Sequence, residues 1–258
     1  MFLRKKRLGL ALGGGAARGF AHIGVLKALS EGGVAPSCVA GTSVGSLIGA
    51  LYCAGHTWED IWQQSQDLDW GDLVKITMPT MGLVKPQKLE SLVDKLVNGA
   101  KIEDLPIPFQ AVAVDLVQGQ QVILDRGPVG RAVRASCSIP GIFTPLEDGE
   151  RLLADGGVLN NLPADVLDDR SCDYILAVDL TDGGLDQHDK PENLAQVMLR
   201  STVIFMSNTG LRGRAVSDMI VVPKLAEYGY HDMSKKQAMM DAGYEAMMEK
   251  MKKLKKRL

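Results

Sequence analysis

The spacing of apolar residues near the N-terminus predicts two strand–helix units in succession. Residues 8–12 form a short apolar run, three glycines follow, and apolar positions at helical spacing occupy residues 20–29. The pattern then repeats, with a strand-like run over 34–42, Ser43 at the turn, and small and apolar residues over 44–54. Each unit is therefore predicted to be a strand that turns sharply into a helix.

Later apolar runs predict further buried strands, separated by helical or looped segments such as residues 191–206. Strands that alternate with helices along a chain indicate an α/β fold, with a mostly parallel sheet covered by helices. The runs are at residues 109–116, 121–124, 152–154, 174–180 and 219–222.

Residues 56–107 interrupt this alternation with Trp58, Trp62, Trp70, Pro79 and Pro86. We expect a largely helical excursion here. Such a segment can be a cap or lid over a site, or an ordinary helical layer on one face of the sheet, and the pattern does not separate the two.

The end of the chain predicts an amphipathic helix. Its apolar side chains recur every three or four positions and its last turns are crowded with lysines. A helix docked on the core explains the stripe, and the helix dipole favours cations at its C-terminus. The alternative is adhesion to an anionic membrane surface. The stripe consists of Met240, Tyr244, Met247, Met251, Leu254 and Leu258.

Composition narrows the class of protein. A chain of 258 residues with 46% hydrophobic residues is expected to fold as a single domain, 1–258, with its motifs in 7–180 and an extension of the same domain in 181–258. A balance of 29 basic against 31 acidic residues gives no cationic field for nucleic acid.

The basic start is followed by too short an apolar run for a signal peptide, and no run approaches the roughly 18 residues of a membrane span. We expect a cytoplasmic protein, with any membrane contact peripheral at the inner face; the oligomeric state is not indicated.

The cysteines are far apart and include no Cys-x-x-Cys pair. We expect them to pack as small hydrophobic residues, and we expect neither a metal nor a cofactor. They are Cys38, Cys53, Cys137 and Cys172.

The segment from Gly41 to Gly45 fits Gly-x-Ser-x-Gly, with Ser43 at its centre. In this pattern small flanking residues let a strand turn sharply into a helix and hold the serine exposed. The expected strand and helix lie on either side, so we interpret Ser43 as a nucleophile. The alternative is an ordinary serine at a helix N-cap.

The glycine loop from Gly13 to Gly19 leads into the first predicted helix, where free N–H groups and the helix dipole favour negative charge. An acyl-transfer enzyme needs such donors for its oxyanion, each worth on the order of 3 kcal/mol. Arg18 adds charge or locks the loop. The loop also loosely resembles a dinucleotide-binding fingerprint, but the acidic residue expected roughly 20 positions on is missing, because the second strand ends at Ser43.

A serine nucleophile needs a base, and Asp155 is the best candidate. It ends an apolar strand and precedes Gly156 and Gly157, which let another group approach closely. Taken alone, an Asp-Gly pair is more typical of a turn. The histidines are expected to be surface or capping residues; they are His22, His56, His188 and His231.

Together these blocks resemble the bacterial patatin-like phospholipases in order and spacing, over roughly residues 7–180. The resemblance implies a three-layer α/β/α fold and a Ser-Asp dyad without histidine, which cleaves lipid acyl esters through an acyl-enzyme intermediate. The blocks are Leu12–Gly19 with His22–Leu26, Gly41–Gly45, Ser138–Phe143 and Asp155–Gly157.

By matching positions, the resemblance implies that Ser43 is the nucleophile and Asp155 the base. The oxyanion region would be the backbone of Gly14, Gly15 and Ala16 together with Arg18. The chain departs from the family at Ala16, where the usual pattern has a third glycine, and alanine restricts positive φ. The supporting motif glycines are Gly13, Gly19, Gly41, Gly45, Gly156 and Gly157.

Two alternatives stay open. An α/β-hydrolase-type esterase could use Ser43, an acid, and His188 or His231, because the chain order is permitted. A regulatory or interaction protein could keep the fold without turnover, for which Ala16 is the only hint.

Overall fold

The computed structural model describes residues 6–67, 69, 75–76, 84–85, 87–168, 172–181, 190–192 and 194–258. Its centre is an eight-stranded sheet in the order β10-β9-β1-β2-β5-β8-β7, with β6 paired to β5. The first five strands of this order are parallel, whereas β6, β7 and β8 run antiparallel to their neighbours. The strands are β1 (Leu8–Leu12), β2 (Cys38–Thr42), β5 (Phe109–Asp115), β6 (Gln120–Leu124), β7 (Leu146–Asp148), β8 (Arg151–Asp155), β9 (Tyr174–Val178) and β10 (Met219–Val221).

The predicted strands are all present, with small differences at their ends. β2 begins at Cys38 rather than at residue 34, because Pro36 has no N–H to donate to a neighbouring strand. The first hydrogen bond to β1 is donated by the Ser37 N–H to the Leu8 carbonyl oxygen. β7 was not predicted, since its three residues carry no apolar run. A separate pair, β3 (Lys75–Ile76) and β4 (Val84–Lys85), lies in the excursion.

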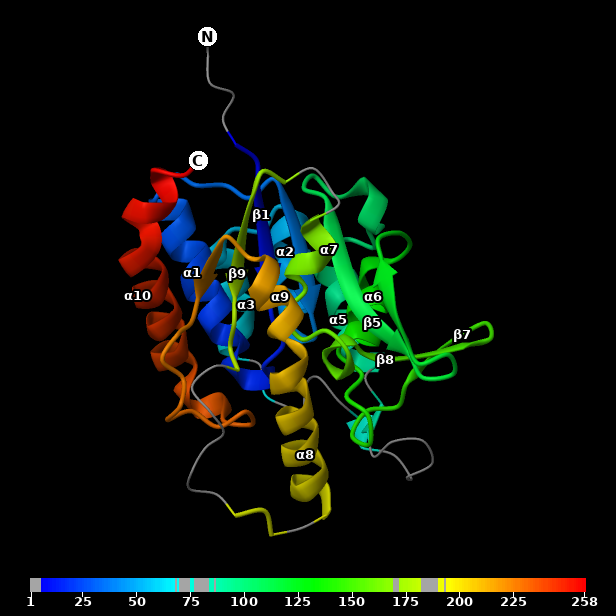
Figure 1. The fold of residues 1–258 in the computed structure, drawn as a ribbon. Helices are drawn as coiled ribbons and strands as arrows, with labels where there is room; N and C mark the ends of the chain where they lie inside the picture. The colour runs from blue at the N-terminus through cyan, green and yellow to red at the C-terminus, as the bar shows by residue number, and fades with distance from the viewer. Residues whose placement is uncertain are drawn as a thin grey trace.

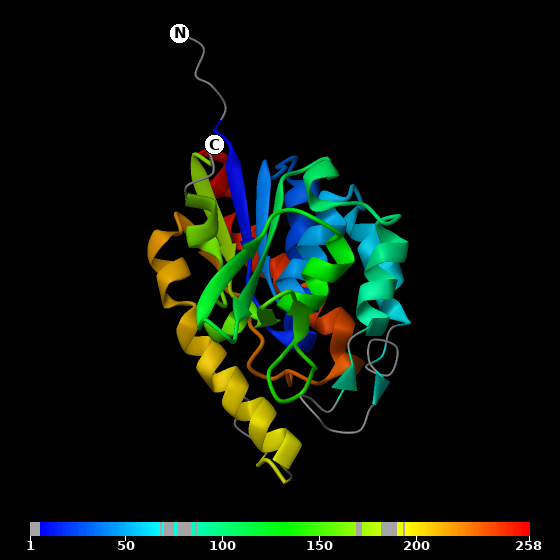
Figure 2. The same ribbon diagram turned by 90° about the vertical axis from the view of Figure 1, so that its right-hand side faces the viewer.

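Helices cover both faces of the sheet, so the predicted three-layer α/β/α fold is confirmed (Figures 1 and 2). Alternate residues of β1 point to opposite faces: Leu10 and Leu12 join the larger core under α1, α2, α5, α6 and α10, while Ala11 joins the smaller core under α7. The helices are α1 (Phe20–Glu31), α2 (Val44–Cys53), α3 (Trp58–Gln66), α5 (Gln87–Leu96), α6 (Val129–Ser136), α7 (Ala164–Asp168), α8 (Leu194–Thr209), α9 (Leu211–Val216) and α10 (Lys236–Lys255).

The C-terminal helix α10 packs lengthwise on α1 (Figure 1). The two backbones approach closely at Gly24 and Gly243: an added Cβ would lie 1.9 Å from the Met240 carbonyl oxygen at the first and 2.0 Å from the Ala21 carbonyl oxygen at the second. The predicted stripe is buried here through Met240, Met247, Met251 and Leu254. Docking on the core therefore explains the stripe, whose buried side chains are not accessible to a membrane.

The excursion over 56–107 is helical in α3 and α5, as expected, and both helices contribute to the larger core through Ile61, Leu89 and Val93. They form part of the helical layer on that face. Trp70, Pro79 and Pro86 lie outside the described residues. Among the helices of the described residues, none is long and apolar enough to cross a membrane.

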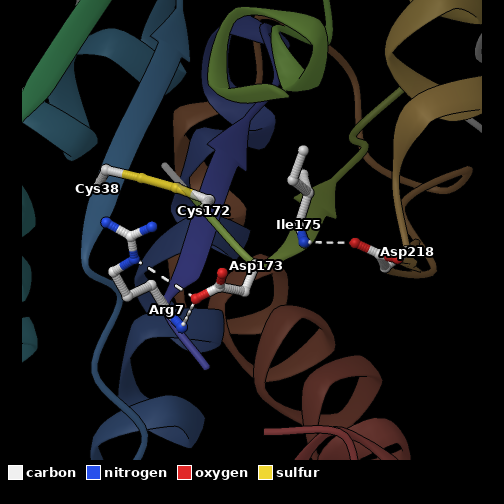
Figure 3. Close-up of a disulfide and its surroundings, with 6 residues drawn as sticks. All are labelled: Arg7, Cys38, Cys172, Asp173, Ile175 and Asp218. Atoms are coloured by element: carbon white, nitrogen blue, oxygen red, sulfur yellow. Dashed lines mark hydrogen bonds and ion pairs between the residues drawn. A yellow bond between two sulfur atoms is a disulfide. The ribbon is translucent and has the colours of Figure 1, made fainter. Parts of the chain in front are cut away.

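A disulfide joins Cys38 at the start of β2 to Cys172 just before β9 (Figure 3). The bond crosses β1 at Gly9, where an added Cβ would lie 2.9 Å from the Cys172 sulfur. The expectation that all cysteines only pack is therefore wrong for this pair, because the parallel register brings together two residues that are 134 positions apart. Cys53 and Cys137 are free thiols.

Candidate active site

One row of residues across the sheet brings the predicted site together. Thr42 pairs with Val112, so Ser43 continues level with Ala113, and Ala113 pairs with Asp155 on β8. On the other side, an added Cβ at Gly14 would lie 3.3 Å from the Ser43 Cβ. β8 is antiparallel to β5, so register brings Asp155 level with Ser43 across β5, which lies between β2 and β8, rather than to the common carboxyl edge of parallel strands.

Ser43 has a backbone conformation that forces its side chain out of the turn between β2 and α2. Its φ is 53° and its ψ is −127°, in the positive-φ region that non-glycine residues rarely adopt. The flanking glycines make room for the turn: an added Cβ at Gly45 would lie 2.1 Å from the Leu12 carbonyl oxygen, and one at Gly41 would lie 2.4 Å from the Gly45 carbonyl oxygen. The Gly-x-Ser-x-Gly pattern thus has a steric cause.

Hydrogen bonds from neighbouring serines stabilise the backbone conformation of Ser43. The Ser43 N–H donates to the Ser136 hydroxyl at 2.9 Å, and that hydroxyl donates to the Val112 carbonyl oxygen at 2.6 Å. The Ser46 hydroxyl donates to the Ser43 carbonyl oxygen at 2.6 Å. Ser136 was not singled out from the sequence, since a serine at the end of a helix carries no distinctive signal.

The Asp155 carboxylate is fully buried. Its Oδ1 accepts from the Gly157 N–H at 2.8 Å, and the Asp155 N–H donates to the Ser138 carbonyl oxygen at 2.9 Å. Its Oδ2 has no hydrogen-bond partner among the described residues. Burial raises the pKa of Asp155 to about 7, although the nearby Ser43 hydroxyl and the Gly157 N–H favour the charged form. The Ser43 hydroxyl is therefore near the carboxylate without a hydrogen bond formed between them.

The glycine loop supplies N–H groups beside Ser43. The Gly14 N–H is engaged by the Asn161 carbonyl oxygen at 3.0 Å, whereas the N–H groups of Gly15 and Ala16 have no acceptor among the described residues. Ala16 adopts a φ of 48°, so the departure from the family pattern is accommodated in the left-handed region. Of the three predicted backbone donors, the N–H groups of Gly15 and Ala16 are therefore free among the described residues, and that of Gly14 is already hydrogen-bonded.

Arg18 lies on the other side of this loop, fully buried, and is not among the residues that line the pocket. Its guanidinium donates to the Tyr228 carbonyl oxygen at 2.9 Å and to the Tyr230 hydroxyl at 2.9 Å, and it stacks 3.9 Å from the Tyr230 ring centre. The Ala17 N–H donates to the Tyr230 carbonyl oxygen at 3.0 Å. The side chain thus locks the loop to the segment before α10.

His22 supports the loop from within α1. Its Nε2 donates to the Gly13 carbonyl oxygen at 2.8 Å, because a carbonyl can only accept. Burial lowers the pKa of His22 to about 4, so its ring is neutral at pH 7. This histidine orients the loop and is not placed to take a proton from Ser43.

The other histidines give the triad alternative little support. His188 lies outside the described residues. His231 is exposed, and the His56 ring is bonded to the Leu96 carbonyl oxygen at 3.0 Å. No histidine is among the described residues that line the pocket.

A pocket of about 370 Å³, counting open space at its mouth, lies over Ser43. Asn161 is its buried polar wall: its Nδ2 donates to the Gly14 carbonyl oxygen at 3.3 Å, while Oδ1 has no partner among the described residues. The lining residues are Gly14, Gly15, Ala16, Ser43, Ile139, Asn161, Thr181, Thr202, Val203, Met206 and Tyr230.

Sequence reasoning missed Asn161, Tyr230 and the side chains from α8. A pair of asparagines so soon after Asp-Gly-Gly was the available signal.

The described residues contain no group of three or more His, Cys, Asp or Glu side chains that could hold a metal ion. Cys137 lies beside the site, where burial and the nearby Asp155 raise the pKa of its thiol. Its thiol therefore stays protonated at neutral pH.

Comparison with known proteins identifies a family to which the chain is similar. A family model described as Patatin-like phospholipase matches residues 10–168. An uncharacterised NTE family protein of Mycobacterium tuberculosis is 38% identical over 204 residues, which are 76% of this chain and 56% of that protein. Neuropathy target esterase sws of Drosophila melanogaster is 35% identical over 198 residues, which are 73% of this chain and 14% of that protein. The chain thus spans little more than half the length of the mycobacterial relative.

Solved structures show the same fold at low sequence identity. VipD of Legionella pneumophila has a TM-score of 0.59 and 14% identity, over 97% of this chain and 67% of that one. The type III effector ExoU has a TM-score of 0.55 and 16% identity, over 97% of this chain and 53% of that one. With the family model covering well over half of its residues, the chain belongs to the patatin-like phospholipase family.

Proposed function

We propose that this protein is a serine acyl hydrolase that cleaves lipid ester bonds through a dyad of Ser43 and Asp155. One observation carries the proposal: the Ser43 side chain is forced outward beside a buried carboxylate that has an unpaired oxygen, Oδ2, among the described residues. Unpaired buried carboxylate oxygens are costly, and one next to an outward-forced serine is typical of a catalytic site.

In the proposed first step, the Ser43 Oγ attacks the ester carbonyl carbon while Asp155 Oδ2 takes the hydroxyl proton. The carbonyl oxygen becomes an oxyanion, which the N–H groups of Gly15 and Ala16 stabilise. The C–O bond to the alcohol then breaks, and the alcohol leaves with the proton held by Asp155. The products of this step are an acyl-Ser43 ester and a free alcohol.

In the second step, water attacks the acyl-Ser43 carbonyl carbon and gives a proton to Asp155. The bond to Ser43 breaks, the proton returns to the Ser43 oxygen, and the carboxylic acid leaves. A pKa of about 7 suits Asp155 to both directions of transfer, because a general base works best when its pKa is near the working pH.

The lining of the pocket supports an acyl chain as the substrate group. Ile139, Val203 and Met206 give apolar walls around Ser43, as an acyl chain requires. The relatives include an esterase and a lysophospholipase of Kluyveromyces lactis, which is 26% identical over 94% of this chain but only 19% of that protein. These names support a lipid ester as the substrate class.

Reaction with a fluorophosphonate probe tests this function. The folded protein should form one adduct, mapped by peptide mass spectrometry to Ser43, and it should hydrolyse p-nitrophenyl butyrate. Ser43→Ala should lose both signals while keeping its circular dichroism spectrum. A folded protein without an adduct, or hydrolysis that survives in Ser43→Ala, would contradict the proposal.

A further inference from the structure

Helix α8 forms one wall of the pocket. Figures 1 and 2 show it as a long helix that extends beyond the sheet and the other helices, in contact with the body mainly through its C-terminal part. One side of α8 faces the site, since Thr202, Val203 and Met206 line the pocket. The Met206 methyl group also approaches Gly157, where an added Cβ would lie 2.5 Å from it.

Several apolar side chains on the other sides of α8 are exposed. Phe205 is 70% exposed, Val197 44% and Ile204 40%. Gly210 continues with helical backbone angles into α9, where Leu211 is 64% exposed. Val197, Ile204 and Leu211 are spaced by seven residues, so they lie on one side of the continued helical path. A helix that is apolar on two sides is normally buried on both.

The charges on this segment have one sign. Residues 194–216 contain Arg200, Arg212 and Arg214 and no acidic residue. The Arg214 guanidinium pairs with the buried Asp179, 2.6 Å away, whereas the Arg212 side chain is 79% exposed and 3.2 Å from Asp165. An exposed apolar stripe with a cation at its end is the pattern of a helix that lies in the interface of an anionic membrane.

We propose that the outer side of α8, together with Leu211, lies on the surface of an anionic lipid bilayer and delivers substrate to the pocket. The proposal rests on the proposed function for the nature of the substrate. A helix is about 10–12 Å across, and an interfacial helix buries its apolar side by roughly 5–10 Å. The wall of the pocket is then one helix diameter from the lipid, so an acyl chain can pass along the flank of α8 without full exposure to water.

This assignment differs from the alternative raised by the sequence, in which the C-terminal helix adheres to a membrane. The apolar stripe of α10 is buried against α1, and exposed apolar side chains are gathered instead beside the pocket. A second copy of this chain could cover the same stripe, but a lipid surface is the occupant that would also supply the proposed substrate to the pocket beside it. A lipid surface satisfies both the apolar and the charged features.

Vesicle binding tests the proposal in the Ser43→Ala protein, so that no lipid is consumed. This protein should co-sediment with vesicles of phosphatidylcholine and phosphatidylglycerol, and adding Ile204→Ser and Phe205→Ser should weaken the partition coefficient by about tenfold or more. Met248→Ser, which removes a 42% exposed methionine from α10, is the matched control and should bind as its parent does. Neither Ile204 nor Phe205 lines the pocket.

Two results would overturn the proposal. The first is vesicle binding that the double substitution leaves unchanged. The second is a dimer, seen by light scattering, that the double substitution dissociates, when neither the parent nor the double variant binds vesicles. With Ser43 present, the double variant should hydrolyse p-nitrophenyl butyrate at the normal rate and vesicle lipid at least about tenfold more slowly. Loss of hydrolysis of the soluble ester in the unmodified protein would instead contradict the proposed function, independently of vesicle binding.

Discussion

The Ser136 hydroxyl is the fixed support of the Ser43 backbone, since it accepts the Ser43 N–H at 2.9 Å. Ser136→Ala leaves that buried N–H without its partner, which costs about 1–3 kcal/mol. We expect thermal unfolding to shift accordingly and kcat for p-nitrophenyl butyrate to fall about tenfold or more, because the outward conformation of Ser43 is no longer held. Ser138→Ala is the control, as that hydroxyl donates only to the Arg134 carbonyl oxygen. Equal losses in the two variants would argue against this role.

The pH dependence of activity should report the ionisation of Asp155. If Asp155 is the base that we propose, it must be unprotonated to accept the Ser43 proton, and burial raises the pKa of Asp155 to about 7. We therefore expect kcat/KM for a soluble ester to rise with pH through about 7 and then level off. A limb with its midpoint near the ordinary aspartate range, about 4, would contradict this assignment.

The same buried carboxylate should make the protein less stable at alkaline pH. Because the pKa of Asp155 is higher in the folded state than in the unfolded state, the folded protein binds this proton more strongly, and the free energy of unfolding falls as pH rises from about 4 past about 7. Asp155→Asn removes this titration. Its melting temperature relative to the parent should therefore increase between pH 5 and pH 8, a change that calorimetry at the two pH values would detect; a pH-independent difference would refute it.

Asn161 should act by holding the oxyanion loop. Its backbone carbonyl accepts the Gly14 N–H and its side-chain amide donates to the Gly14 carbonyl oxygen. The Asn161→Ala variant keeps the first bond and loses the second, so we expect kcat to fall by about ten- to a hundredfold with a smaller change in KM. The neighbouring Asn160→Ala is a fair comparison, because the Asn160 side chain bonds to Gln121 and Asp165 instead. An equal reduction of kcat in Asn160→Ala and Asn161→Ala would contradict the proposed role of the Asn161 side chain.

The link between Cys38 and Cys172 should contribute to stability. It closes a span of 134 residues, and native disulfides typically stabilise a fold by about 2–4 kcal/mol. Paired replacement by serine, or reduction with dithiothreitol, should lower the melting temperature, while Cys53→Ser should leave the response to reductant unchanged. A thiol titration of the unfolded, unreduced protein should find two free cysteines; four would show that the bond does not form.

Much of the architecture could be predicted from the apolar runs, because strands buried on both faces consist mostly of apolar residues. Ser43 and Asp155 could be singled out because each is flanked by glycines where chains approach closely. Ser136, Asn161 and Tyr230 could not. Each is an ordinary polar residue whose importance depends on a hydrogen bond or stacking contact to a segment far away in sequence, and only the folded register brings those partners together. The antiparallel direction of β8 was hidden for the same reason.

The attachment of the glycine loop to Tyr228 and Tyr230 ties the first 20 residues of the chain to a segment more than 200 positions later. The turn at Ser43 and the strand that ends at Asp155 therefore leave the ribosome well before the residues that bind Arg18. During synthesis, the loop beside Ser43 can therefore reach its folded arrangement only after residues 228–230 have been made, later than strands β1, β2, β5 and β8 that surround it.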